Sequence, residues 1–346
     1  MGDIDIHIAG RVGRITLNRP QALNALTYDM VRAVDEALIT WADDDRVAMV
    51  VIDGAGDKAF CAGGDIAEMY ASGRAGDYAY GRRFWRDEYA MNARLARFPK
   101  PVVSFLHGFT MGGGVGLGCH ASHRIVCETS RIAMPECGIG LVPDVGGSLL
   151  LARAPGRLGE YLATTAARMT AADAIYAGFS DYFIPADDWP DLIAQLEAAG
   201  DPMAIEKAAR EPGDSTLATD AAQIDQLFAG ERVQDILNAL AATQTDLAHK
   251  CTEALARVSP LSAAAALMLV RRVRGLDTIG HALEMEYRFT HRAMEHGDFL
   301  EGIRAAIIDR DRLPQWRFTD HIAAHEAARA MLRPLGDASL KLEGRA

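Results

Sequence analysis

The sequence predicts an α/β fold in which strands and helices alternate over the first half of the chain and helices make up the second half. Two observations support this fold class. Between residues 4 and 185, short apolar runs alternate with longer amphipathic stretches, and Gly or Pro separates them. Beyond about Pro185 the strand-like runs fade, and Ala, Leu and Glu recur at helical spacing. Such alternation favours a layered α/β architecture over a β-sandwich or a helical bundle.

The first half of the chain contains the expected strands. They are runs rich in β-branched and apolar residues at 5–8, 14–17, 48–53, 101–106 and 123–128. Helices are expected over 27–41, over 78–97, and from the glycine-rich bend after Leu106 to about Ala121. Thr27 offers the side-chain oxygen of a helix N-cap. No strict sequence repeat relates these segments.

The second half of the chain is expected to be helical, including 191–198, 262–274 and 320–331. We therefore divide the chain into a core region, residues 1–190, and a helical C-terminal region with an insertion, residues 191–346. The polar segment 210–215 fits a surface loop as well as a linker. The polar end of the chain is expected to fray, since termini are ordered only where something ties them down.

The composition indicates a globular protein of a reducing compartment. Of the 346 residues, 49% are hydrophobic, which suffices for a large core. The formal net charge of −11 repels nucleic acid and anionic membranes. The five cysteines form no C-x-x-C pair, and no apolar run approaches the roughly 18 residues of a membrane span. Because the N-terminus also lacks signal-peptide features, we expect a cytoplasmic protein without nucleic-acid or membrane partners.

Two glycine-rich segments could present backbone N–H groups to a ligand. Segment 58–66 ends an apolar run with Gly63 and Gly64, where small residues allow close approach. Segment 108–116 follows a strand and opens a helix, whose N-terminus suits an oxyanion. Its spacing fits neither the dinucleotide fingerprint nor a phosphate loop. The alternatives are a plain turn for the first segment and close helix packing for the second.

Two carboxylates stand in an apolar, glycine-rich context. Glu136 follows a proline, and Asp144 precedes Val-Gly-Gly. Carboxylates are costly to bury without partners, so both are candidate acids or bases, although Asp144 could instead cap a helix. The chain has no G-x-S-x-G elbow and no cysteine signature of a nucleophile. Any acyl transfer would therefore depend on carboxylates and water.

A metal site is not expected. His321 and His325 lie four residues apart on a predicted helix, but the pattern lacks the glutamate of H-E-x-x-H. We predict no metal and no cofactor.

The segments 17–25, 59–66 and 107–114 together resemble signatures of the crotonase superfamily, also called the enoyl-CoA hydratase/isomerase family, over roughly residues 4–185. The resemblance implies a spiral of strand-strand-helix turns, followed by helices that often mediate assembly into trimers or hexamers. It implies an acyl-CoA substrate whose thioester oxygen accepts from the N–H groups of Gly64 and Gly113. It also implies CoA binding around Ala62, Gly63, Asp65 and Ile66, so that CoA is part of the substrate and not a cofactor.

The resemblance is finer in five segments, which are similar to 3-hydroxyisobutyryl-CoA hydrolases of this family: 84–92, 110–117, 133–136, 142–147 and 296–316. Hydratases carry a glutamate on the helix after the glycines, whereas Gly116 stands there in this chain. Of the two hydratase glutamates, this chain has only Glu136. The preferred interpretation is therefore hydrolysis of a short 3-hydroxyacyl-CoA, a reaction of the valine-catabolism type.

The hydrolase resemblance also implies residue roles. Glu136 would be the base or nucleophile, Asp144 its partner, and Glu88 the acceptor for the β-hydroxyl of the substrate. The alternative for Glu88 is a carboxylate on the surface of a helix. Two alternatives to a hydrolase remain at this point: an enoyl-CoA hydratase or isomerase, and a binding module for acyl-CoA or RNA without catalysis.

Overall fold

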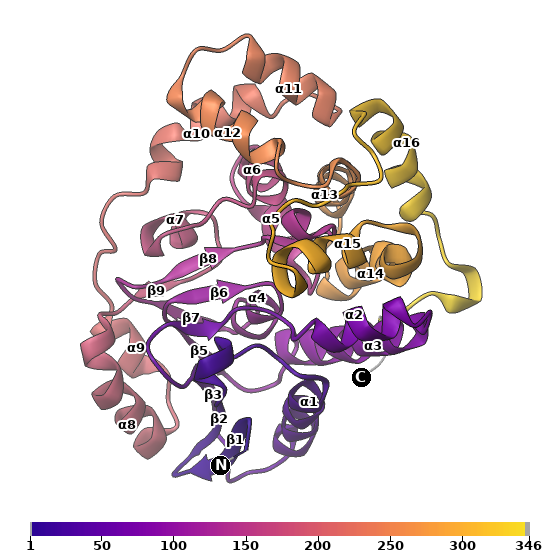
Figure 1. The fold of residues 1–346 in the computed structure, drawn as a ribbon. Helices are drawn as coiled ribbons and strands as arrows, with labels where there is room; N and C mark the ends of the chain where they lie inside the picture. Colours follow the sequence, from indigo (N-terminus) through magenta and orange to yellow (C-terminus); the bar gives the residue numbers. More distant parts are fainter. Residues whose placement is uncertain (1, 343–346) are drawn as a thin grey trace. The chain divides into compact units, whose positions relative to one another are not determined.

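The computed structural model describes residues 2–342 (Figure 1). These residues belong to two compact units. Unit 1 consists of Met1–Asp65, Ala90–Ala133 and Arg168–Ala218, and unit 2 of Ile66–Tyr89, Met134–Ala167 and Thr219–Ala346. Each unit is thus assembled from three separate stretches of the chain. Neither unit coincides with the sequence regions 1–190 and 191–346.

Unit 1 contains a sheet of six strands in the order β1-β2-β3-β5-β7-β9. The first two strands form an antiparallel hairpin, and all other pairs are parallel. The strands are β1 (Ile4–Ala9), β2 (Val12–Leu17), β3 (Met49–Gly54), β5 (Val102–Leu106), β7 (His123–Val126) and β9 (Tyr182–Phe183). The five strands expected from the sequence are confirmed, because their apolar runs are long enough to be recognised.

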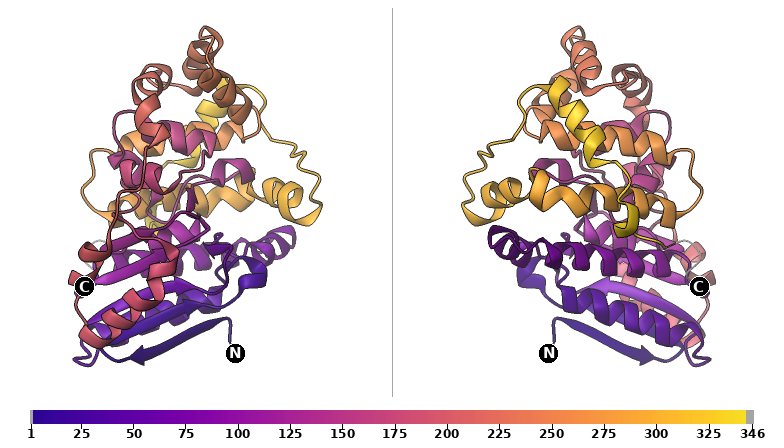
Figure 2. Two further views of the ribbon diagram at one scale, coloured as in Figure 1. Left: turned by 90° about the vertical axis from the view of Figure 1, so that its left-hand side faces the viewer. Right: turned by 90° about the vertical axis from the view of Figure 1, so that its right-hand side faces the viewer.

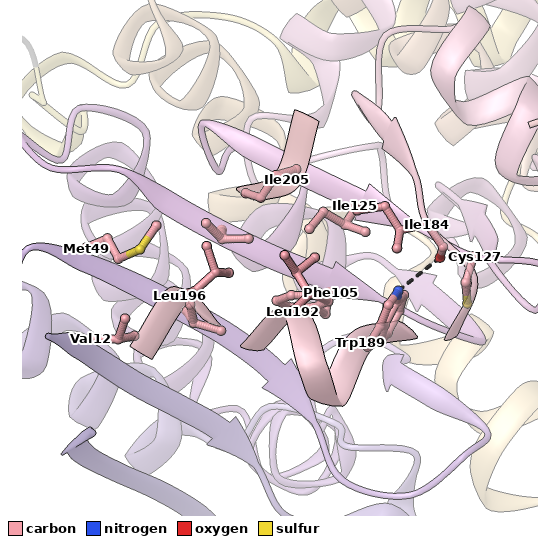
Figure 3. Close-up of a cluster of buried hydrophobic side chains, with 12 residues drawn as sticks. Val12, Met49, Phe105, Ile125, Cys127, Ile184, Trp189, Leu192, Leu196 and Ile205 are labelled. Atoms are coloured by element: carbon pink, nitrogen blue, oxygen red, sulfur yellow. Dashed lines mark hydrogen bonds between the residues drawn. The ribbon is translucent and has the colours of Figure 1, made fainter. Parts of the chain in front are cut away.

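Helices cover both faces of this sheet, as parallel strands require. On one face, α8 (Trp189–Ala199) and α9 (Met203–Ala208) pack on a cluster of buried side chains from the strands (Figure 3). The Trp189 indole lies edge-on to Phe105, with ring centroids 5.0 Å apart, and donates to the carbonyl of Ile184 at 2.9 Å. Val12 faces this cluster, whereas a side chain on its neighbour Gly13 would meet Trp41 of α1 (Tyr28–Ala42). Since strand side chains alternate, α1 covers the opposite face (Figure 2).

A second sheet of unit 1 escaped the sequence prediction. Its strands β4 (Ala59–Cys61), β6 (Phe109–Met111) and β8 (Arg131–Ala133) pair in parallel and have three residues each. A run of three residues is too short to show the alternation that identifies a strand. The chain order β1-β2-α1, then β5-β6-α4, displays the expected strand-strand-helix turns.

The predicted helices of the first half are also present. Helix α1 begins after Thr27, whose hydroxyl accepts from the N–H of Met30 at 3.2 Å, as the N-cap prediction requires. The boundary between the units crosses α3 (Tyr78–Ala96) at Tyr89. Helix α4 (Gly113–Gly118) is shorter than expected and ends before Ala121. The remaining regular elements of unit 1 are η1 (Pro20–Ala22), α7 (Ala171–Tyr176) and η3 (Ala186–Asp188).

Unit 2 is helical, as the sequence predicts for the second half of the chain. Its central helix α13 (Pro260–Val273) packs against α5, α6, α14 and α16, because a run of alanines lets neighbouring helices approach closely. The elements around it are α2 (Ala67–Arg74), η2 (Glu136–Ile139), α5 (Gly147–Arg153), α6 (Leu158–Thr165), α11 (Val233–Ala241), α12 (Asp246–Leu255), α14 (Ile279–His296), α15 (Phe299–Ile303), the π-helix η4 (Arg304–Ile308), α16 (His321–Met331) and η5 (Gly336–Ala338). Helix α10 (Thr216–Leu227) begins in unit 1 and continues in unit 2.

The end of the described chain departs from the prediction. Leu340 and Leu342 are buried, and the N–H of Leu342 donates to the Glu284 carboxylate at 2.8 Å. The expected fraying is therefore wrong up to Leu342, because these two apolar side chains tie the tail down. Residues 343–346 lie outside the described part of the chain.

Within residues 2–342, no single helix is both long and apolar enough to cross a membrane, although α12 and α13, bent by 115°, meet the length and composition requirement as a pair.

Candidate active site

Four of the buried carboxylates in the described part of unit 2 have a raised pKa, and they come from four different elements. Glu88 lies on α3, Glu136 on η2, Asp144 in the loop before α5, and Glu286 on α14. Glu88, Glu136 and Asp144 are each 4% exposed, and Glu286 is fully buried. Burying carboxylates destabilises a fold unless partners or protons neutralise them, so such a group indicates a working site. The structure brings together the three acids predicted from the sequence and adds Glu286.

The Glu136 carboxyl is held in a short turn and has no polar partner on one oxygen. Its Oε2 atom is buried without a hydrogen-bond partner among the described residues. The turn itself is fixed by the N–H of Ser259, which donates to the Cys137 carbonyl at 2.9 Å. A side chain on Gly302 of α15 would overlap the Ile139 carbonyl, so the backbones pack closely there. Burial, together with the negative charge of Asp144, raises the pKa of Glu136 well above its usual range.

Asp144 has a dedicated hydrogen-bond donor. The hydroxyl of the fully buried Tyr89 donates to Asp144 Oδ2 at 2.6 Å and also lies 3.3 Å from Thr290 Oγ1. Burial raises the pKa of Asp144 to about 7, while the hydrogen bond from Tyr89 acts in the opposite direction. Helix α5 begins at Gly147 with Gly146 as its N-cap, so Asp144 is not the helix cap that the sequence also allowed.

Glu286 was missed by the sequence analysis. Its carboxylate accepts hydrogen bonds from the N–H of Gly146 at 2.9 Å, the N–H of Ser148 at 3.1 Å and the Ser148 hydroxyl. Burial raises the pKa of Glu286 to about 8, although these hydrogen bonds oppose the shift. The two segments that it joins are more than 130 residues apart, so no local pattern could have revealed the contact.

Glu88 is not a surface residue. It is 4% exposed and precedes Tyr89 directly on α3, so the helix-surface alternative is wrong. Burial and the charge of Asp144 raise the pKa of Glu88 well above its usual range. Tyr89, Ser148 and Thr290 were not predicted either. The one available signal was the four-residue spacing of Glu286 and Thr290, which places both on one face of α14.

The four acids form a coupled group that favours partial protonation. The charge of Asp144 raises the pKa of each of the other three, and in Glu136 the charges of Glu286 and Glu88 add to it. At Asp144 the hydrogen bond from Tyr89 opposes this rise in pKa because it stabilises the charged form. Because ionisation of one acid raises the pKa of its neighbours, the group favours one carboxylate beside neutral carboxylic acids, which is what proton transfer requires.

The two glycine segments lie side by side in unit 1. A Cβ placed on Gly63 would lie 3.5 Å from the Met111 carbonyl oxygen and 4.0 Å from the nitrogen of Gly113. Leu26 and Gly64 form an isolated parallel β-bridge. Its two hydrogen bonds run from the N–H of Leu26 to the Gly63 carbonyl and from the N–H of Asp65 to the Leu26 carbonyl, so the N–H of Gly64 takes no part in it. Gly113 is the first residue of α4, where N–H groups have no acceptor within the helix. Both groups can therefore serve a ligand.

The residues predicted to bind CoA occupy the loop after β4. The N–H of Ala62 donates to the Leu23 carbonyl at 3.0 Å, and Gly63 has a left-handed φ of 116°. The Asp65 carboxylate accepts from Arg19 at 3.0 Å, which fixes its side chain. Ile66, the N-cap residue of α2, belongs to unit 2.

No group of three or more His, Cys, Asp or Glu side chains suited to a metal ion occurs between residues 2 and 342. His321 and His325 lie on α16, as predicted.

The chain is similar to known proteins over nearly its full length. Residues 12–331 match the family described as enoyl-CoA hydratase/isomerase. A protein of Danio rerio named "3-hydroxyisobutyryl-CoA hydrolase, mitochondrial" is 37% identical, with 89% of this chain and 83% of that protein covered. The human protein of the same name is 34% identical, with coverages of 96% and 89%.

Two solved structures share the fold. An enoyl-CoA hydratase from Rhodobacter sphaeroides 2.4.1 is 55% identical, with a TM-score of 0.94 over 98% of this chain and 100% of that one. A carnitinyl-CoA dehydratase from Mycobacterium thermoresistibile is 40% identical, with a TM-score of 0.94 over 100% of both chains. The resemblance and the fold class inferred from the sequence are thereby confirmed. The chain belongs to the enoyl-CoA hydratase/isomerase family, the crotonase superfamily.

Proposed function

We propose that this protein hydrolyses the thioester of a short 3-hydroxyacyl-CoA, with 3-hydroxyisobutyryl-CoA as the substrate, to the free acid and CoA. The observation that carries the proposal is the buried pair Glu136 and Asp144, combined with glycine at position 116. Two-glutamate addition of water needs a second glutamate on α4, and Gly116 supplies no carboxylate. The relatives named 3-hydroxyisobutyryl-CoA hydrolase support the same reaction.

Hydration or isomerisation of an enoyl-CoA is the second candidate. It is favoured by the names of the two solved structures, which are 55% and 40% identical to this chain and are described as a hydratase and a dehydratase. In that reaction Asp144 would have to provide the second acid beside Glu136. The two candidates differ in their products, because only hydrolysis breaks the C–S bond and releases the thiol of CoA.

In the proposed reaction the N–H groups of Gly64 and Gly113 donate to the thioester oxygen. Attack on the carbonyl carbon places negative charge on this oxygen, so donors that are already oriented stabilise the transition state. When the tetrahedral intermediate collapses, the C–S bond breaks and CoA leaves as the thiolate. Losing one such donor would slow the reaction by about 10²–10³-fold.

Glu136 and Asp144 are proposed to act as a pair that holds one proton. Glu136 is the base or nucleophile, either activating water or attacking the carbonyl to form an anhydride that water opens. Ionisation of one acid opposes ionisation of the other, which keeps the second in its neutral form. The neutral acid can then protonate or orient the leaving thiolate.

Glu88 is proposed to accept a hydrogen bond from the β-hydroxyl of the substrate, because it is buried beside the same acids. A buried polar group left unpaired is costly, so substrates without the hydroxyl would be disfavoured. CoA is proposed to bind at Ala62, Gly63, Asp65 and Ile66. We further propose a trimer or hexamer in the cytoplasm that requires no cofactor.

The test compares release of free thiol from 3-hydroxyisobutyryl-CoA with hydration of crotonyl-CoA, using the wild type and Glu136→Gln. The exposed Glu326 provides a matched control, Glu326→Gln. Rapid thiol release that only Glu136→Gln abolishes, with little hydration, supports the proposal. Hydration without thiol release would refute it and favour the second candidate.

A further inference from the structure

We propose that Glu286 is a positioning residue, which holds the turn after Asp144 and thereby sets where the Asp144 carboxylate lies. The inference rests on the proposed function, in which Asp144 takes part in proton transfer. Glu286 itself has no role in that reaction.

The turn that follows Asp144 has an unfavourable backbone conformation. Val145 has a φ of 54° and Gly146 a φ of 79°, so two successive residues are left-handed. This conformation is rare for a β-branched residue such as valine, because its Cβ crowds the backbone. Surrounding contacts must therefore maintain the turn.

Glu286 supplies those contacts. Its two carboxylate oxygens accept from the N–H groups of Gly146 and Ser148 and from the Ser148 hydroxyl, and all three donors lie within four residues of Asp144. Helix α5 has no side-chain cap of its own, because its N-cap residue is Gly146. The carboxyl group of Glu286 on α14 thus replaces the missing cap and ties the turn to a long helix.

The same helix also fixes the side chain of Asp144. Thr290 lies one turn beyond Glu286 and contacts the Tyr89 hydroxyl, which donates to Asp144. Helix α14 therefore supports Asp144 twice, through Glu286 at the backbone and through Thr290 and Tyr89 at the carboxylate. A residue that merely capped α5 would not need to be fully buried next to a functional acid.

A double-mutant cycle on thiol release from 3-hydroxyisobutyryl-CoA tests the inference. Glu286→Gln keeps the size of the side chain but turns an NH₂ group toward one of the donors. In the wild-type background it should lower kcat by about 10–100-fold with little change in KM, as a misplaced reacting group does. In an Asp144→Asn background the same change should lower kcat by no more than about twofold. The matched control is Glu284→Gln on the same helix, which should leave kcat unchanged.

Each outcome of the cycle is informative. If the two substitutions lower kcat independently, or if Glu286→Gln lowers only the melting temperature, Glu286 does not act through Asp144 and the inference is overturned. If Asp144→Asn leaves thiol release intact, the role of Asp144 in the proposed function fails first, and this inference fails with it. Should Glu286→Gln not fold, Ser148→Ala enters the cycle instead, because it removes one of the three donors and keeps the buried acid. Ser148→Ala should then lower kcat less than Glu286→Gln, and its effect should again largely disappear in the Asp144→Asn background. If the effects of Ser148→Ala and Asp144→Asn on kcat are additive, the inference is overturned.

Discussion

The Tyr89 hydroxyl donates a 2.6 Å hydrogen bond to Asp144, and this bond stabilises the charged form of a buried acid that lies beside three others. All four have a raised pKa because burial penalises their charged forms. Tyr89 stabilises only the charged form of Asp144. The pKa of Asp144 therefore depends on a hydroxyl group that does not itself react.

Removing this hydroxyl should shift the pH dependence of the reaction. The hydrogen bond lowers the pKa of Asp144, so Tyr89→Phe should raise it. Because Asp144 is proposed to act in its neutral form beside an ionised Glu136, the alkaline limb of kcat/KM should move to higher pH by about 0.5–1 unit. The ratio of activity at pH 8 to activity at pH 6 should therefore rise relative to the wild type. The measurement is kcat/KM for thiol release between pH 5 and pH 9, with Tyr182→Phe as the control. An alkaline limb that stays at the wild-type pH would contradict the role assigned to the hydrogen bond.

Removing the Asp144 charge should change how stability depends on pH. The pKa of Asp144 is raised from 3.8 to about 7, so the folded protein binds this proton more tightly than the unfolded chain. The resulting stabilisation is complete below about pH 4 and is lost as the pH rises through about 7, with an upper limit on the order of 4 kcal/mol.

In Asp144→Asn the side chain at position 144 does not titrate, so this pH-dependent loss of stability does not occur. Relative to the wild type the variant should therefore gain stability between pH 4.5 and pH 8, as measured by urea unfolding at several pH values. Asp337→Asn, at an exposed position, serves as the control. A difference between Asp144→Asn and the wild type that is the same at every pH would rule out this linkage.

Adding one methyl group at Gly114 should disrupt the glycine segments of unit 1. A Cβ at this position would overlap the Cys61 carbonyl, so the start of α4 and the end of β4 must move apart. If Gly64 and Gly113 hold the thioester oxygen, Gly114→Ala should lower kcat by about 10²–10³-fold. Gly275→Ala is the control, since nothing lies within 4 Å of the added Cβ. Wild-type kcat in folded Gly114→Ala would argue against an oxyanion site there.

Replacing Glu88 should alter substrate preference more than chemistry. Glu88→Gln should lower kcat/KM for 3-hydroxyisobutyryl-CoA by about 10–100-fold and leave that for isobutyryl-CoA nearly unchanged, because the second substrate lacks the β-hydroxyl. The ratio of the two kcat/KM values is the readout, with Glu326→Gln as the matched control. Equal losses on both substrates would place Glu88 in the chemistry and not in recognition of the hydroxyl.

Much of the fold could be predicted from the sequence because it depends on local patterns. The apolar runs at β3 and β5 and the capping threonine before α1 are each contained within a few consecutive residues. Glu136 and Asp144 were predicted in the same way, since carboxylates in an apolar, glycine-rich stretch are unusual wherever they occur. The three-residue strands β4, β6 and β8 were missed because so short a run carries no periodicity.

The sequence by itself therefore determined the family, the order of the longer strands and of the first helices, and three of the four candidate acids. Only the tertiary structure decided how those acids behave. Glu88 became a buried acid only because its face of α3 is covered, and Asp144 acquired a donor because Tyr89 lies against it. Glu286 entered the site because α14 brings it to a turn more than 130 residues earlier in the chain. Burial and hydrogen bonding set the pKa of a carboxyl group, and both depend on residues that are neighbours in space but distant in sequence.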